Sequence, residues 1–207
     1  LAVTGTFTGN NKKVFFTNST LIQTIQGTAL TIPYVVYQPA TTGIQLTGAG
    51  TNLTISAPLG GNAITFNSAT DFFDINSRTL TIGTSGVSNT INAGTFRGST
   101  TSSLTLLGTG SIGNLSFSGT AAQQALGTFT VNRTTGSIAC VMGSDVTINT
   151  SLALNGIVDL DSRTMTLVAA ATITGPTLPD ATNTNYIIAD NAFAATLRKG
   201  YTTTGSL

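Results

Sequence analysis

The sequence predicts an all-β protein built as a parallel β-helix with short irregular caps. Three observations support this fold class: a strand phrase that recurs along the chain, a two-residue alternation of apolar and polar positions, and the lack of a convincing amphipathic helix. The phrase is a large apolar residue, Thr, a second large apolar residue and then, in most copies, a small or polar residue. It begins at Leu53, Leu80, Leu104, Phe129, Val146 and Met165.

The spacing of this phrase favours a solenoid. The first four copies start 27, 24 and 25 residues apart, and the next two follow after 17 and 19 residues. A strand that returns every twenty-odd residues is typical of coils that stack on one another. The alternative is an antiparallel β-sandwich, which also has short alternating strands at near-regular spacing. The recurrence of one phrase favours the solenoid, because the strands of a sandwich need not resemble each other.

Alternation within the phrases predicts which side chains point inward. Apolar residues two positions apart lie on one face of a strand and the intervening Thr lies on the other. We therefore expect columns of buried side chains along the axis, formed by Leu53, Ile55, Leu80, Ile82, Leu104, Leu106, Phe129, Val131, Met165 and Leu167.

Changes in composition divide the chain into three segments. Residues 1–40 are more apolar and aromatic and lack the clean phrase, so we interpret them as an N-terminal cap or upstream coils. Residues 41–175 form the repeat body. In residues 176–207, Pro176 and Pro179 interrupt the pattern, and two runs, at 186–189 and 194–197, predict closing strands.

Low charge separates this chain from several functional classes. Charged residues make up 7% of the chain, and Thr makes up about a fifth, whereas globular proteins average about 25% charged residues. The eight basic residues are scattered, so the sequence predicts no nucleic-acid partner. No apolar run is long enough for a membrane-spanning helix, so no transmembrane segment is expected.

The residue inventory argues against catalysis. The chain contains no His, no Glu and no Trp, which removes the commonest general base and the commonest nitrogen ligand of metals. The single Cys140 lies in an apolar run and is expected to be a buried, inert thiol. We predict that the chain is not an enzyme and has no catalytic, cofactor-binding or metal-binding residues and no cofactor.

Two pairs of acids leave alternatives open. Asp159 and Asp161 would put two carboxylates on one strand face, where they could hold Ca²⁺ or act as the paired acids of a β-helical polysaccharide lyase or hydrolase. Solvent-facing strand and turn residues beside Arg163 are the favoured interpretation. Asp71 and Asp74 could likewise form a Ca²⁺ loop, but a plain turn is favoured, because the oxygen-dense pattern of Ca²⁺-binding repeats is lacking.

Thr-x-Thr pairs recur along the chain, and a flat ladder of such pairs would suit an ordered surface such as ice. Ordinary strand propensity on a wet face is the favoured interpretation. The intervals between repeats vary too much to predict a flat, lattice-matched surface.

From about Gly94 onward the chain resembles a known class of repeat. The residues that carry the resemblance are 113–117, 126–136, 143–149, 152–160, 164–167, 185–190 and 197–199. They are similar to the repeat blocks of very large cell-surface proteins of Bacteroidota, exported by the type IX system, which include gliding and attachment adhesins. Residues 41–93 resemble these blocks weakly.

The resemblance implies an extracellular, cell-surface β-solenoid that serves as a stalk or adhesive module. The expected partners are neighbouring segments of a longer chain or further copies of this chain, with glycans or solid surfaces as ligands. A self-assembling filament subunit is the alternative function, and a polysaccharide lyase or hydrolase is a third.

Overall fold

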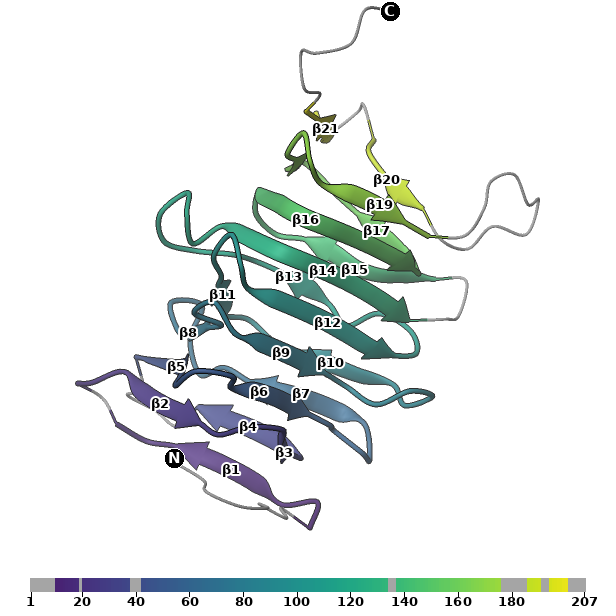
Figure 1. Cartoon of the computed structure of the whole chain (residues 1–207). Coiled ribbons are helices and arrows are strands. Elements are labelled where there is room, and N and C mark those ends of the chain that lie inside the picture. The colour runs from purple at the N-terminus through teal and green to yellow at the C-terminus, as the bar shows by residue number, and fades with distance from the viewer. Residues whose placement is uncertain are drawn as a thin grey trace, which may run out of the picture.

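The computed structural model describes residues 10–18, 20–37, 42–133, 137–175, 186–190 and 194–200. These residues form stacked coils of β-strand without a helix, rising from β1 at the bottom of Figure 1 to β21 near the top. All strand pairs within the described ranges are parallel. The predicted parallel β-helix is confirmed, and the antiparallel sandwich is wrong.

The first four coils have three strands each. They are β1 (Lys13–Phe16), β2 (Gln23–Gln26) and β3 (Leu30–Ile32); β4 (Tyr34–Tyr37), β5 (Gly43–Thr47) and β6 (Asn52–Ile55); β7 (Gly61–Thr65), β8 (Phe72–Asp74) and β9 (Thr79–Ile82); and β10 (Asn89–Ile91), β11 (Thr95–Arg97) and β12 (Ser103–Gly108). Corresponding strands stack into the sheets β1-β4-β7-β10 and β2-β5-β8-β11, and into the start of a third sheet.

Within the described residues, the later coils contribute strands to two sheets only. They contain β13 (Asn114–Leu115), β14 (Ala125–Arg133), β15 (Ile138–Met142), β16 (Val146–Asn155), β17 (Ile157–Asp159), β18 (Thr164–Leu167), β19 (Thr172–Thr174), β20 (Ile187–Ile188) and β21 (Thr196–Lys199). The third sheet, which we call the long sheet, runs β3-β6-β9-β12-β14-β16-β18-β21, with β19 also paired to β16. A fourth sheet is β13-β15-β17-β20.

The register of the long sheet corrects one detail of the predicted repeat. Phe129 pairs with Leu152 and not with Val146, whose partner on the next coil is Met165. The strand β16 has ten residues, so its first half pairs with β18 and its second half with β19. The phrase at Phe129 therefore lies on the second half of β14, whereas the phrase at Val146 lies on the first half of β16, which explains the short interval of 17 residues between them.

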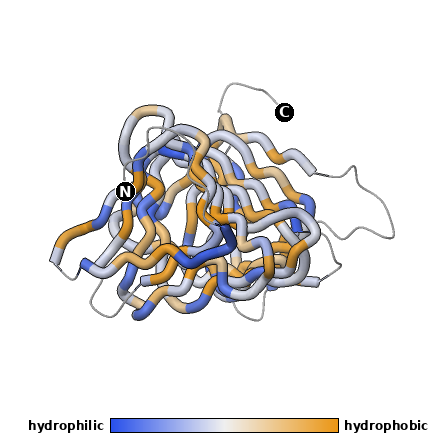
Figure 2. The backbone as a smooth tube through the Cα atoms, turned by 90° about the horizontal axis from the view of Figure 1, so that it is seen from below, coloured by the Kyte–Doolittle hydropathy of each residue, from blue (hydrophilic) through white to orange (hydrophobic). Residues whose placement is uncertain are grey.

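The core consists of apolar columns that run along the axis. Every residue predicted to point inward is at most 1% exposed. One column follows the strand register of the long sheet through Leu30, Leu53, Leu80, Leu104, Phe129, Leu152 and Ile173. In the view of Figure 2, apolar and polar segments alternate along the backbone, as a two-residue period requires.

A row of aromatic rings fills part of the interior. The ring centroids of Tyr37 and Phe66 lie 4.8 Å apart, those of Phe66 and Phe96 5.9 Å, and those of Phe96 and Phe117 6.2 Å. These spacings are typical of favourable aromatic pairs. The four rings come from successive coils, so they tie the stack together from within.

The outer segments carry strands that join the same sheets. Strands β2, β3 and β4 pair with β5, β6 and β7 of the repeat body, and β1 pairs with β4. Strands β20 and β21 pair with β17 and β18. The residues of the expected caps at 1–9 and 201–207, with Pro176 and Pro179, lie outside the described residues. Within the described ranges, no helix is long and apolar enough to cross a membrane.

Candidate binding surface on the long sheet

The outward face of the long sheet carries two rows of hydroxyl-bearing side chains. The strand register places Thr79, Ser103, Thr128, Ser151 and Thr172 in one row. It places Thr31, Thr54, Thr81, Thr105, Thr130 and Thr174 in the other, which Ala153 interrupts between Thr130 and Thr174. Neighbours within a row are about 4.8 Å apart, and the rows are about 6.6 Å apart. The hydroxyl of Ser151 donates to that of Thr128 at 3.3 Å.

The rows stay in register although the repeats differ in length. The strand pairs from β6 to β12 are continuous without a register shift, and the extra residues fall in the turns. A single irregularity between β14 and β16 lies at Leu126–Thr128, before the hydroxyl rows resume. The variation in interval therefore does not break the register of the rows.

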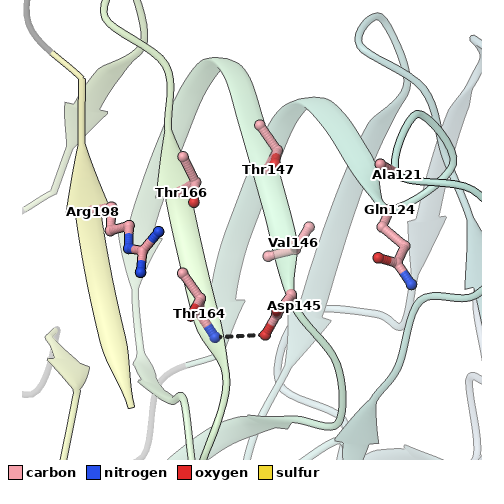
Figure 3. Close-up of a pocket in the computed structure, with 8 residues that line it drawn as sticks. All are labelled: Ala121, Gln124, Asp145, Val146, Thr147, Thr164, Thr166 and Arg198. Atoms are coloured by element: carbon pink, nitrogen blue, oxygen red, sulfur yellow. Dashed lines mark hydrogen bonds between the residues drawn. The ribbon is translucent and has the colours of Figure 1, made fainter. Parts of the chain in front are cut away.

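A groove lies on the same sheet towards its C-terminal end (Figure 3). Its volume is about 290 Å³. The lining residues are Ala121, Gln124, Asp145, Val146, Thr147, Thr164, Thr166 and Arg198. Thr147, Thr166 and Arg198 are successive partners in the ladder of β16, β18 and β21, so they form the floor and one wall.

The groove holds one acid and one base. Asp145 immediately precedes β16, and its Oδ1 accepts the backbone N–H of Thr164 at 2.7 Å. Arg198 lies on β21, is exposed, and extends toward Thr164 and Thr166 in Figure 3. Sequence reasoning did not single out either residue as part of a site. No local motif joins them, because stacking alone brings their coils together.

Asp159 and Asp161 do not share a strand face, and their places at the end of a strand and in a turn agree with the interpretation that the sequence favoured. β17 ends at Asp159, and Asp161 lies in the following turn with a φ of 51°. The backbone N–H of Asp161 donates to Oδ1 of Asp159 at 2.9 Å. The two acids therefore form a local turn motif, because the strand ends before its alternation reaches Asp161.

Asp71 and Asp74 are buried and used internally. Oδ2 of Asp71 accepts the backbone N–H groups of Asn67 and Ser68, both at 2.9 Å. Oδ1 of Asp74 accepts the N–H of Asn76 at 2.9 Å, and its Oδ2 accepts Nε2 of Gln45 at 2.8 Å. The carboxylates thus close turns and join neighbouring coils. In the part of the chain that the structure describes, no three His, Cys, Asp or Glu side chains gather as a metal site would require.

Two further side chains that could take part in chemistry, Cys140 and Arg133, are buried. Cys140 is fully buried, as predicted, and burial raises the pKa of its thiol to about 12. Arg133 is 1% exposed, which the sequence did not reveal. Burial lowers the pKa of its guanidinium from the usual value. A charged side chain gives no sequence signal of burial when its partners are backbone carbonyls from other coils.

Comparisons of the chain with protein-family models, with curated proteins and with solved structures found no match. The function of the long sheet is therefore inferred from its geometry. The sheet has two candidate binding features, the hydroxyl rows and the charged groove.

Proposed function

We propose that this chain is a non-catalytic extracellular module with a structural and adhesive role, a segment of a large bacterial surface protein or fibre. The observation that carries the proposal is the outward face of the long sheet, whose hydroxyl rows stay in register across successive coils. Each hydroxyl both donates and accepts hydrogen bonds. Such a neutral array suits contact with glycans or with hydrated solid surfaces.

The interior supports the structural half of the proposal. Each coil is hydrogen-bonded to its neighbours through parallel ladders, and apolar columns and aromatic rings run through several coils. Side chains add further links between coils, such as Asn155 Nδ2 donating to Oδ1 of Asn132 at 2.7 Å. A load along a surface fibre would have to break many such contacts together, which suits a stalk.

Adhesion is tested with the isolated chain on a panel of glycans and solid surfaces. The informative variant replaces three hydroxyls of one row by the β-branched isostere valine: Thr81→Val, Thr105→Val and Thr130→Val. A control replaces threonines on other sheets: Thr47→Val, Thr65→Val and Thr90→Val. We expect the row variant to weaken binding about tenfold, since each lost hydrogen bond contributes about 1 kcal/mol or less, and the control to leave it unchanged. Absence of binding by the unaltered chain to every glycan and surface would refute the proposal.

A filament subunit is the second candidate, because the apolar columns are open at the C-terminal end. Ile173 is 52% exposed although its partner Leu152 is fully buried, and Leu197 is 40% exposed beside the buried Met165. Leu21 and Ile22, between β1 and β2 of the first coil, are exposed at 65% and 46%. A second copy stacked end to end would cover such side chains.

Self-association is tested by sedimentation over a wide concentration range. A filament subunit should grow with concentration, and the substitutions Ile173→Lys and Leu197→Lys should keep it monomeric, because charge at the end of a column opposes burial. A chain that stays monomeric at every concentration would eliminate this candidate and leave the adhesive module.

A further inference from the structure

The groove on the long sheet differs in charge from the rest of that sheet's outward face. Among the described strands of the long sheet, the charged residues are Arg133, Arg198 and Lys199. Arg133 is buried, and Nζ of Lys199 donates to the carbonyls of Val168, Ala169 and Ala171 at 2.7 to 2.9 Å. Arg198 is therefore the one charged side chain that these strands present outward.

The guanidinium of Arg198 is available to a ligand. It makes no hydrogen bond or ion pair to another residue of the described ranges, and it reaches over the groove from β21. A planar guanidinium binds a carboxylate through two parallel hydrogen bonds, which is its strongest and most specific pairing. The groove thus offers a carboxylate-binding group beside a polar floor.

The remaining lining residues match the hydroxyls of a sugar. The hydroxyls of Thr147 and Thr166 and the amide of Gln124 can donate and accept, and the carboxylate of Asp145 accepts. With one acid and one base, the groove suits a ligand that combines one carboxylate with several hydroxyls. A second carboxylate brought into the groove would be repelled by Asp145. The volume of about 290 Å³ is close to the lower end of known ligand sites.

We propose that this groove binds a uronic acid residue of an acidic polysaccharide, with Arg198 on its carboxylate and Asp145 on its hydroxyls. The proposal rests on the adhesive function proposed above and specifies its ligand class. In this proposal, the hydroxyl rows hold the chain to a polyhydroxyl surface, and the groove selects surfaces that carry carboxylated sugars.

The test compares polygalacturonate with fully methyl-esterified polygalacturonate, which has the same backbone without the charge. Binding of the unaltered chain is measured by calorimetry together with two variants that lose the same charge. Arg198→Gln removes the groove base, and Arg163→Gln removes an exposed arginine outside the groove. Matching thermal midpoints would show that both variants are folded.

We expect the acid to bind at least about tenfold more tightly than the ester, because a charge-assisted pair contributes about 1.5 kcal/mol or more. Arg198→Gln should abolish this preference and Arg163→Gln should keep it. Equal binding of acid and ester, or equal losses in both variants, would overturn the proposal. If the chain still bound neutral glycans or solid surfaces, the adhesive function would stand, whereas failure to bind any of them would refute that function itself.

Discussion

Arg133 binds Asn89, a residue 44 positions earlier in the chain, at two atoms. Its Nη1 donates to Oδ1 of Asn89 at 3.1 Å, and its Nη2 donates to the backbone carbonyl at 2.8 Å. Further donors reach the carbonyls of Gly110 at 2.9 Å, Thr109 at 2.7 Å and Leu107. One buried guanidinium therefore satisfies the backbone where β10 and the turn after β12 meet the end of β14.

Replacing Arg133 by methionine should strongly destabilise the fold. Methionine fills similar space but donates no hydrogen bond, so several buried carbonyls would lose their partners. We expect the free energy of unfolding to fall by about 3 kcal/mol or more, measured by urea denaturation. The exposed Arg163→Met variant should change it by no more than about 0.5 kcal/mol. Similar losses of unfolding free energy in both variants would show that the burial of Arg133 does not account for its contribution to stability.

The turn after β9 offers a pair of glycines that separates crowding from backbone strain. A Cβ at Gly83 would lie 2.2 Å from the carbonyl oxygen of Leu107, whereas a Cβ at Gly86 would meet nothing within 4 Å. Both glycines have a positive φ, 98° and 76°. We expect Gly86→Ala to cost about 1 kcal/mol through strain alone and Gly83→Ala about 3 kcal/mol. Equal shifts in the urea midpoint would contradict the close approach of the two coils.

Column register can be tested at two neighbouring positions. Leu152 is fully buried and its partner Ile173 is 52% exposed. Leu152→Ala should destabilise the protein by about 2 to 5 kcal/mol, because it leaves a cavity in the core. Ile173→Ala should cost about 1 kcal/mol or less, since its side chain keeps much of its contact with water. If Val146 rather than Leu152 followed Phe129 in the column, Leu152→Ala would destabilise the protein less than Ile173→Ala.

Stability should depend on alkaline pH through Cys140. Burial raises the pKa of its thiol to about 12, whereas an unfolded thiol titrates near about 8.5. Above that value the unfolded chain loses the proton and the native chain keeps it, so the free energy of unfolding falls as pH rises. The expected loss is about 2 kcal/mol by a pH of about 10.

The matched variant for this measurement is Cys140→Ala, followed by urea unfolding at a series of pH values. Above a pH of about 9, the free energy of unfolding of the unaltered chain should fall more steeply than that of the variant. The difference between the two slopes should be about 1.4 kcal/mol per pH unit. Burial also raises the pKa of Tyr37, but Tyr37 is present in both proteins. Parallel pH profiles would mean that the thiol is accessible to solvent in the native state.

The fold class and the inward positions were predictable because they depend on local patterns. Alternation within Leu80–Ile82 places both apolar side chains on one face, and recurrence of the phrase predicts stacked coils. Both features were confirmed. The partner of Phe129 was not predictable, because the runs that begin at Val146 and Leu152 both alternate correctly and only the neighbouring strand decides which one pairs with it.

The candidate site depended on tertiary structure throughout. Asp145 and Arg198 belong to different coils, and they line one groove because β16, β18 and β21 stack in a particular register. Arg133 is buried for the same reason, since its acceptors come from β10 and the turn after β12. Amino-acid order alone defined the strands and their inward faces, because each strand's alternation is contained within a few residues. Which side chains meet across coils was decided by the strand ladders, since hydrogen bonding between coils joins residues that share no local pattern.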